Sequence, residues 1–371
     1  MRRGWYVAGA ILLLVDVMAL TWWIRRREPP TSTPLFVVEP TAAVPVRNAL
    51  AFGAWPTPRT NLLADVQVGL FQPTASGQLE SALYGSVRTG SSGGRIHPSF
   101  HEGIDIAPLA RDRSGRARDP VFAVADGRVV HANRHAGNSN YGVYVVLMHE
   151  DALGEVYTLY AHLADIDRAI RPGHPVGAGT VLGRMGNTPS HIVPVSRSHL
   201  HFETGVMLNS AFERWWAVRH KKNRNSHGRF HGWNLQGCDP LRLFADREHR
   251  GHIFSLLTHL LELPVAFEIL MPATHLPDYY CRYPALWTGG PFNGPAFVMA
   301  VSEGGIPLRG RPATADEITR LGGPGKTPVV LSADPSVLGN NGKRLVARRG
   351  EGWALGSQGS QWLDILMWVA E

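Results

Sequence analysis

The sequence predicts a mostly β fold, in which an antiparallel β-sheet domain follows an N-terminal transmembrane helix and precedes a C-terminal α+β extension. Three observations predict it. An apolar stretch opens the chain, short apolar runs alternate with turn signals across residues 71–245, and 40 Gly and 27 Pro favour many turns. With 44% hydrophobic and 18% charged residues, the composition is that of a globular protein and argues against a disordered one.

The first predicted element is a membrane anchor at residues 1–27. Between Gly4 and Ile24 the only charged residue is Asp16, and this length suits the roughly 20 residues of a membrane-spanning helix. No small-residue cleavage site follows the apolar run, so an uncleaved anchor is favoured over a signal peptide. Arginines flank the stretch on both sides and do not fix its orientation.

Residues 28–70 are rich in Pro, Thr and Ala, which predicts an extended linker and lead-in. In the β-rich region that follows, Asp126-Gly127 between two apolar runs predicts a hairpin of strands 121–125 and 128–132. Further apolar runs predict strands at 144–148, 156–163 and 181–185. Helical spacing of leucines predicts one helix over 247–263, at the start of a C-terminal region, 246–371, to which the sequence assigns no function.

Residues able to bind a metal concentrate in three segments. His101 and Asp105 stand four apart, and the nearby Gly103 argues against a helix, so on a strand both would point to one side. His199 and His201 share a strand face in the same way, and His162 ends an apolar strand. Two histidines and one carboxylate are a minimal hydrolytic zinc set that leaves a fourth position for water. Each segment alone is weak evidence, because Asp105 also suits a turn cap and a lone His-x-His is common on surface strands.

These segments belong to a longer ordered pattern. It comprises His-x-Gly-x-Asp at 101–105, Pro-Val-x-Ala-x-x-Asp-Gly-x-Val at 120–129, Gly-x-x-Val-x-x-x-His at 142–149, Tyr-x-x-Tyr-Ala-His-Leu at 157–163, a Gly-rich turn within 171–186, and His-Leu-His-Phe-Glu at 199–203. In this pattern the chain resembles the M23 family of zinc metallopeptidases, the lysostaphin and LytM type that cuts peptide cross-links in bacterial peptidoglycan. The resemblance covers about residues 70–208 and implies a LytM-type peptidase domain, which we expect to span 71–245.

The resemblance also implies roles for individual residues. His101, Asp105 and His201 would bind Zn²⁺, and His162 and His199 would form the catalytic pair. Zinc would lower the pKa of its water toward about 7, with His199 as the preferred general base and His162 stabilising the oxyanion, although exchanged roles stay open. A further family histidine, His149, is interpreted as structural.

The chain departs from the family pattern at 111–119, 188–197 and 213–231, and the first two loops are expected to rim the cleft. The insertion at 213–231 mixes basic and aromatic residues, and we interpret it as a solvated loop, with attachment to anionic wall or membrane polymers as the alternative. The net charge of +7 suits an anionic partner, and no nucleic acid is expected. The basic residues are Arg214, Arg219, Lys221, Lys222, Arg224 and Arg229, among Trp215, Trp216 and Phe230.

The predicted function is a zinc-dependent endopeptidase that hydrolyses peptidoglycan cross-links outside the cytoplasmic membrane, anchored by a single span. Two alternatives stay open: a zinc-free regulator or scaffold of other cell-wall hydrolases, and a cell-wall binding module. The intact set of five histidine and aspartate positions argues against a degenerate site. Residues 47–70 or the 188–197 loop are candidates for covering the site and keeping it latent.

Two smaller expectations concern residues outside this set. Cys238 and Cys281 are candidates for a disulfide in an oxidising compartment, with neither outcome favoured. On the predicted helix 247–263, three histidines lack a nearby carboxylate constellation and are interpreted as surface residues. They are His249, His252 and His259.

Overall fold

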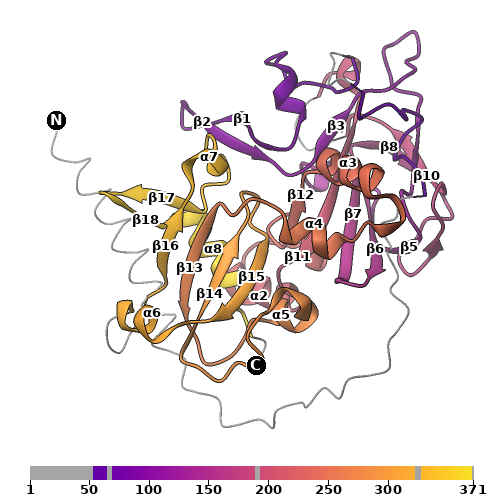
Figure 1. The fold of residues 1–371 in the computed structure, drawn as a ribbon. Helices are drawn as coiled ribbons and strands as arrows, with labels where there is room; N and C mark the ends of the chain where they lie inside the picture. The colour runs from indigo at the N-terminus through magenta and orange to yellow at the C-terminus, as the bar shows by residue number, and fades with distance from the viewer. Residues whose placement is uncertain (1–52, 65–68, 189–192, 322–326, 370–371) are drawn as a thin grey trace, which may run out of the picture.

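The computed structural model describes residues 53–64, 69–188, 193–321 and 327–369 (Figure 1). The predicted anchor at 1–27 lies outside these residues, as does most of the predicted linker. Among the described helices, none has the length and apolar character needed to cross a membrane.

A seven-stranded antiparallel sheet forms the centre of the predicted peptidase region. Its strand order is β12-β11-β7-β6-β5-β9, and β3 pairs with the first part of β11. All eight residues of β11 are buried, and β11 lies between β12 and β7 in the sheet. The strands are β3 (Ile104–Ile106), β5 (Gly127–Asn133), β6 (Tyr144–Asp151), β7 (Gly154–Ala161), β9 (Pro175–Val176), β11 (Leu200–Met207) and β12 (Leu235–Cys238).

Two smaller sheets flank it. One is the hairpin of β1 (Gly85–Ser92) and β2 (Arg95–His101). The other has the order β4-β10-β8, formed by β4 (Pro120–Phe122), β8 (Leu163–Ile166) and β10 (Val181–Met185). Short 3-10 turns connect these strands at η1 (Leu79–Ala82), η2 (Ala136–Asn138) and η3 (Val195–Arg197).

The C-terminal region is α+β, as predicted. A four-stranded antiparallel sheet has the order β15-β14-β13-β16, and β17 pairs with β18. The strands are β13 (Phe267–Pro272), β14 (Ala296–Val301), β15 (Pro307–Pro312), β16 (Val329–Ala333), β17 (Val346–Arg349) and β18 (Gly352–Leu355). The helices are α5 (Asp278–Arg282), η6 (Pro284–Leu286), α6 (Ala315–Arg320), α7 (Pro335–Leu338) and α8 (Ser357–Leu366).

Apolar runs explain most of the predicted strands. The predictions of strands at 144–148 and 181–185 are confirmed by β6 and β10. In β6 the first six residues are all buried, as expected for a continuous apolar run covered on both faces. The predicted strand 156–163 is two strands, because His162 takes φ +62° and separates β7 from β8.

The predicted hairpin at Asp126-Gly127 is wrong. β4 pairs with β10, whereas β5 pairs with β6 and β9, so the chain changes sheets between them. Asp126 instead contacts two other segments of the chain. Its Oδ1 accepts from the Ala178 amide, and its carbonyl oxygen lies 2.7 Å from Nδ1 of His149 on β6. The dipeptide signal is local and does not report which strands pair.

The predicted helix 247–263 is also wrong as a single element. It is divided into α3 (Pro240–Arg250), η5 (Gly251–Ile253) and α4 (Leu256–Leu261). Gly251 takes φ +54°, which ends α3, and the Ser255 side chain caps α4 by accepting from Thr258 N. Ile253, an apolar residue within the predicted helix, is 68% exposed.

The insertion at 213–231 is ordered structure and not a solvated loop. It contains α2 (Phe212–Arg219) and η4 (Gly228–Phe230), and Trp215 is 1% exposed. Asp364 of α8 accepts from Trp215 Nε1 at 2.7 Å and pairs with Arg219 at 2.8 Å. Trp215, one of the aromatic residues of the insertion, therefore packs it onto the C-terminal helix α8.

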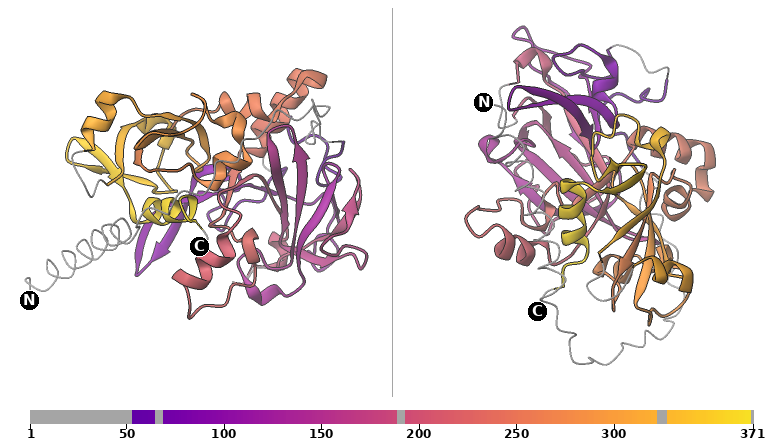
Figure 2. Two further views of the ribbon diagram at one scale, coloured as in Figure 1. Left: turned by 90° about the horizontal axis from the view of Figure 1, so that it is seen from below. Right: turned by 90° about the vertical axis from the view of Figure 1, so that its left-hand side faces the viewer.

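The peptidase region and the C-terminal region share one hydrophobic core. Helix α3 packs against β11 and α4 against β15, between the two large sheets in Figure 1. Figure 2 shows α8 where the two regions meet. Asn209, just after β11, donates to the carbonyls of Ile365 and Trp368, so backbone at the end of α8 is fixed to the peptidase region.

Candidate metal centre and active site

The central strand β11 brings the predicted metal ligands together. His201 on β11 is the cross-strand partner of Asp105 on β3. Opposite side chains on antiparallel strands lie close on one face, so this register places the imidazole beside the carboxylate. His201 Nδ1 lies 2.9 Å from Asp105 Oδ1.

His101 joins them from the end of β2. Its Nε2 lies 3.2 Å from Asp105 Oδ1 and 3.0 Å from His201 Nδ1. The structure brings the His101 and Asp105 side chains together, but the two residues lie on different strands and not on one strand as expected. Gly103 separates β2 from β3, and a Cβ there would lie 2.2 Å from the Phe202 carbonyl, so only glycine lets β3 approach β11 this closely.

The outer nitrogen of each ligand histidine faces an acceptor. His101 Nδ1 lies 2.7 Å from the Leu83 carbonyl, and His201 Nε2 lies 2.8 Å from Glu203 Oε1. Since these partners accept, they place the ring protons on the outer nitrogens. The inner nitrogens of both rings and Asp105 Oδ1 then direct lone pairs at one point.

This donor set fits a zinc ion. The ligand atoms of His101, Asp105 and His201 all lie within 4.8 Å of one another, and all three residues are buried. Three converging lone pairs repel one another unless a cation or a shared proton lies between them, and two imidazoles with one carboxylate are a set that zinc prefers. Burial lowers the pKa of His101 and opposes protonation of His201, but hydrogen bonds to Asp105 and Glu203 raise the pKa of His201 to about 9.

Arg88, for which the sequence predicts no role, lies against the Asp105 carboxylate. Its Nη2 donates to Asp105 Oδ2, leaving Oδ1 toward the histidines. Burial opposes the charged form of Asp105, but Arg88 and the neighbouring histidines outweigh burial and hold the pKa of this carboxyl well below its usual range. Arg88 comes from β1, 17 residues before Asp105, and no pattern in the sequence links the two.

The predicted catalytic pair lies beside the ligands. The ring centroids of His162 and His199 are 4.8 Å apart, and that of His162 is 5.6 Å from His201. His199 Nδ1 lies 2.7 Å from the Arg197 carbonyl, so it carries the proton, and Nε2 is the free lone pair, 3.6 Å from Asp105 Oδ1. Within the described part of the chain, His162 Nδ1 is buried and has no hydrogen-bond partner.

The environment keeps both catalytic candidates neutral. Burial lowers the pKa of His199, and burial together with His199 and His201 holds the pKa of His162 well below its usual range. A neutral imidazole can accept a proton at one nitrogen and donate one from the other.

Glu203 and Tyr157 form a hydrogen-bonded chain that orients the ring of His201. Tyr157 donates to Glu203 Oε2 at 3.0 Å, and Glu203 Oε1 faces His201. Glu203 is part of the His-Leu-His-Phe-Glu pattern, but its role escaped the sequence analysis. The two-residue spacing from His201 on a strand was the available signal, since i and i+2 share a face.

The other predicted histidines lie elsewhere. His149 is fully buried between the Asp126 carbonyl and Thr158 Oγ1, which agrees with a structural role. The interpretation of His259 as a surface residue is wrong, because it is 2% exposed and its Nδ1 lies 3.0 Å from Asp246. Both cysteines are free, with Cys238 buried and Cys281 exposed.

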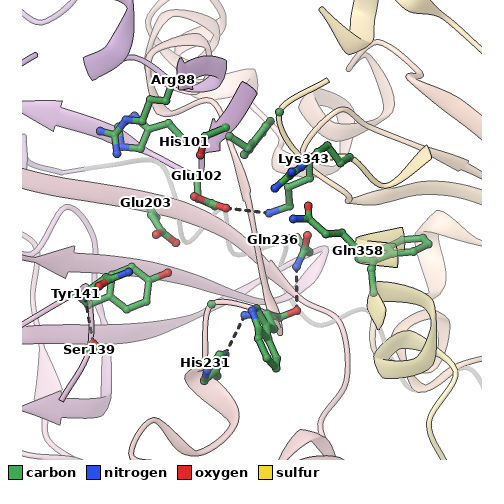
Figure 3. Close-up of a pocket in the computed structure, with 18 of the residues that line it drawn as sticks. Arg88, His101, Glu102, Ser139, Tyr141, Glu203, His231, Gln236, Lys343 and Gln358 are labelled. Atoms are coloured by element: carbon green, nitrogen blue, oxygen red, sulfur yellow. Dashed lines mark hydrogen bonds and ion pairs between the residues drawn. The ribbon is translucent and has the colours of Figure 1, made fainter. Parts of the chain in front are cut away.

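A cavity of about 650 Å³ opens over the site (Figure 3). His101, His162 and His201 line it from the peptidase region, and Lys343 and Gln358 line it from the C-terminal region. Figure 3 shows Lys343 and Gln358 across the pocket from Tyr141 and Glu203. Part of the cleft wall thus comes from a region that the sequence left without a role.

The loops that were expected to rim this cleft do not line it in the described residues. Arg111 instead donates to the Val195 and Ser198 carbonyls, so the 111–119 loop contacts the 193–198 segment. The described parts of 47–70 and 188–197 are likewise absent from the cavity wall.

Comparison with known proteins locates the similarity in this region. The profile of peptidase family M23 matches residues 99–211. Lipoprotein NlpD of Yersinia enterocolitica is 33% identical over 92 residues, which are 25% of this chain and 82% of that protein. The catalytic domain of lysostaphin from Staphylococcus simulans is 27% identical, with 33% of this chain and 77% of that one covered and a TM-score of 0.24. A zinc-containing peptidase from Vibrio cholerae is 25% identical, with 37% and 36% covered and a TM-score of 0.25.

Proposed function

Because the chain belongs to peptidase family M23, we propose that it is a zinc-dependent endopeptidase that hydrolyses peptide cross-links of bacterial peptidoglycan. The observation that carries the proposal is the convergence of His101 Nε2, Asp105 Oδ1 and His201 Nδ1 on one point, with two neutral histidines beside them. A zinc-free regulator would not need this buried set.

The proposed ligands are His101, Asp105 and His201. Zinc bound there supplies a Lewis acid and lowers the pKa of water toward about 7. His199 is placed to accept a proton at Nε2, because its Nδ1–H is engaged by the Arg197 carbonyl. The proposed role of His162 is to donate from Nδ1, which has no hydrogen-bond partner among the described residues, to the oxyanion that develops on the substrate carbonyl.

The surrounding strands keep these groups aligned. His201, Asp105 and the end of β7 lie in one hydrogen-bonded ladder, where His201 pairs with Asp105 on one side and Ala161 on the other. His162 follows Ala161 directly, and its amide donates to the Tyr141 carbonyl at 3.0 Å. The strand end next to His162 therefore supports the position of this proposed catalytic residue relative to the proposed ligands.

We further propose the chain organisation that goes with this activity. Residues 71–245 form the peptidase region, 28–70 the linker and 246–371 a C-terminal region that completes the cleft. Residues 1–27 anchor the chain by a single span in the cytoplasmic membrane, with the catalytic region on its outer side, where peptidoglycan lies. The word lipoprotein in the name of the Yersinia enterocolitica relative supports an envelope location.

The proposal is tested by metal analysis and peptidoglycan digestion with the full chain purified in detergent. We expect about one zinc per chain, and fragments released from sacculi that mass spectrometry identifies as cleaved cross-links. Chelation should stop release, and added zinc should restore it. If the chain binds zinc and releases nothing, or if release is unaffected by chelation, the proposed activity is wrong.

A further inference from the structure

The C-terminal region contributes charge to the catalytic cavity. Residues Gly342–Leu345 line the same cavity as the proposed ligands His101 and His201, together with Gln358 and Gln361 of α8. These residues follow the ligands by more than a hundred positions, and they lie outside the segment that matches the peptidase family, 99–211.

Hydrogen bonds fix this segment onto the peptidase region. The Gly342 amide donates to Ser86 Oγ at 2.8 Å, and Asn340 Nδ2 donates to the Ser86 carbonyl at 3.3 Å. Lys343 Nζ lies 3.1 Å from Glu102 Oε1 and 5.0 Å from the centre of the Phe100 ring. The segment is therefore a fixed part of the cavity wall next to His101.

Most charged groups of the wall are already paired. Glu203 faces His201 and Tyr157, Lys343 pairs with Glu102, and Arg88 pairs with Asp105 behind the wall. Arg344 is different, because no ion pair among the described residues includes it. Its Nη2 lies 2.9 Å from the side-chain oxygen of Gln358, which is neutral, when that amide is oriented to satisfy both of its neighbours.

The backbone of Arg344 is held in a conformation that non-glycine residues seldom adopt. Its φ is +53°, and its amide donates to the Asn341 carbonyl at 3.2 Å. Asn341 also has positive φ, and its Nδ2 donates to the Val346 carbonyl at 2.9 Å. This turn places Arg344, which is exposed and has no carboxylate partner among the described residues, in the wall of the catalytic cavity.

We propose that Arg344 forms an anion subsite of the catalytic cleft that selects peptides carrying a free carboxylate near the scissile bond. The inference rests on the proposed function, since it names the class of peptide that is cleaved. A guanidinium recognises a carboxylate through two parallel N–H···O bonds, which a carboxamide cannot match in charge. Lys343 contributes indirectly by neutralising Glu102, which would otherwise repel the same carboxylate.

The test compares matched cross-linked peptides whose carboxylates next to the scissile bond are either free or converted to carboxamides. The full chain should cleave the free form with kcat/KM about fivefold higher, the size expected for a partly exposed ion pair. Because the contact is electrostatic, this preference should shrink as salt rises from about 0.05 to about 0.5 M.

Variants at Arg344 should alter the preference and not the chemistry. In Arg344→Gln the ratio should fall close to one, because only the free form loses an ion pair, and Arg344→Lys should retain part of the ratio. Arg349→Gln removes the same charge from an exposed position on β17 outside the cavity wall, and it should keep the full preference.

Binding measured by calorimetry separates this inference from the proposed function. If neither peptide is cleaved but the free form binds more tightly in an Arg344-dependent way, the anion subsite stands and the peptidase proposal fails. If both peptides are cleaved equally well, or if Arg344→Gln and Arg349→Gln behave alike, the subsite is overturned and the peptidase proposal is untouched. Equal binding of the two peptides without cleavage overturns both.

Discussion

His201 and Glu203 form a hydrogen-bonded pair on β11, with His201 Nε2 2.8 Å from Glu203 Oε1. The pair turns the other ring nitrogen toward Asp105 and His101. The orientation of this proposed ligand therefore depends on a carboxylate that does not itself face the metal position.

Replacing Glu203 tests this dependence. In Glu203→Gln the amide keeps its size but loses the charge that holds the Nε2 proton, so zinc affinity should fall by about 10- to 100-fold. Competition with a chromogenic chelator measures it. Tyr157→Phe removes only the second bond to Glu203 and should have a smaller effect. Equal zinc affinity in Glu203→Gln and the unaltered chain would contradict the role.

Ligands and catalytic residues should separate by zinc content. His201→Ala or Asp105→Ala removes one of three proposed ligands, so bound zinc and hydrolysis should be lost together. His162→Ala and His199→Ala keep all three ligands, so zinc should stay near one per chain while hydrolysis falls by about 10²- to 10⁴-fold. Metal analysis and sacculus digestion measure the two quantities.

His199 and His201 give this comparison its internal control, since they are two residues apart at the start of β11. General damage to the strand would affect both variants alike. Loss of zinc from His199→Ala with retention in His201→Ala would reverse the ligand assignment.

Gly103→Ala should abolish zinc binding without altering any ligand. Its Cβ would lie 2.2 Å from the Phe202 carbonyl, so β3 must move away from β11 and Asp105 from His201. Gly137→Ala is the matched control, because a Cβ there meets nothing within 4 Å. Zinc content and thermal unfolding of the two variants are compared, and an unchanged zinc content in Gly103→Ala would show that the strands tolerate the shift.

The free energy of unfolding should fall as pH is lowered from about 7 to about 4. Burial, with a contribution from His227, lowers the pKa of His131 to about 4, below the roughly 6.5 of an unfolded histidine. Between these values the unfolded chain binds the additional proton, so stability present above pH 6.5 is lost as pH falls.

His131→Phe tests this assignment. The variant should remove roughly 1 to 2 kcal/mol of the pH-dependent change, allowing for the partial exposure of the group. Urea unfolding at several pH values measures the change. His174→Phe makes the same substitution at an exposed position and is the control for the substitution itself. If the free energy of unfolding of His131→Phe depends on pH as strongly as that of the unaltered chain, groups other than His131 cause the effect.

Asp364→Asn should loosen the joint between the peptidase and C-terminal regions. Asp364 accepts from Trp215 Nε1 and pairs with Arg219, so loss of its charge should cost about 1 to 3 kcal/mol of unfolding free energy. Asp316→Asn on α6 is the control, at an exposed position. Chemical denaturation followed by tryptophan fluorescence compares them, and equal midpoints would show that the shared apolar core alone holds the regions together.

The sequence by itself determined which residues are candidates for the site, and it determined several of the strands. His101, Asp105, His162, His199 and His201 stand in short local patterns that can be read from the sequence. Strand periodicity placed His101 and Asp105 on one strand, whereas they lie on β2 and β3. The apolar runs of β6 and β10 were likewise readable, because the burial of a strand depends mainly on its own side chains.

Tertiary structure alone decided the features that depend on pairing between distant segments. Asp126-Gly127 has the composition of a hairpin turn, yet the strands on its two sides belong to different sheets. His259 is buried in the folded protein, where it contacts Asp246, 13 residues earlier. The contact forms because α3 and α4 are two separate helices, and one continuous helix would keep these residues apart.

The same reason explains the surroundings of the proposed metal site. Arg88 reaches Asp105 from another strand, and Lys343 reaches Glu102 from 241 residues away. Such contacts arise from the packing of whole elements around a shared core, so they cannot be predicted from the local sequence around either residue. The sequence therefore predicts which atoms could bind zinc, while the fold decides which charges surround them and which region closes the cleft.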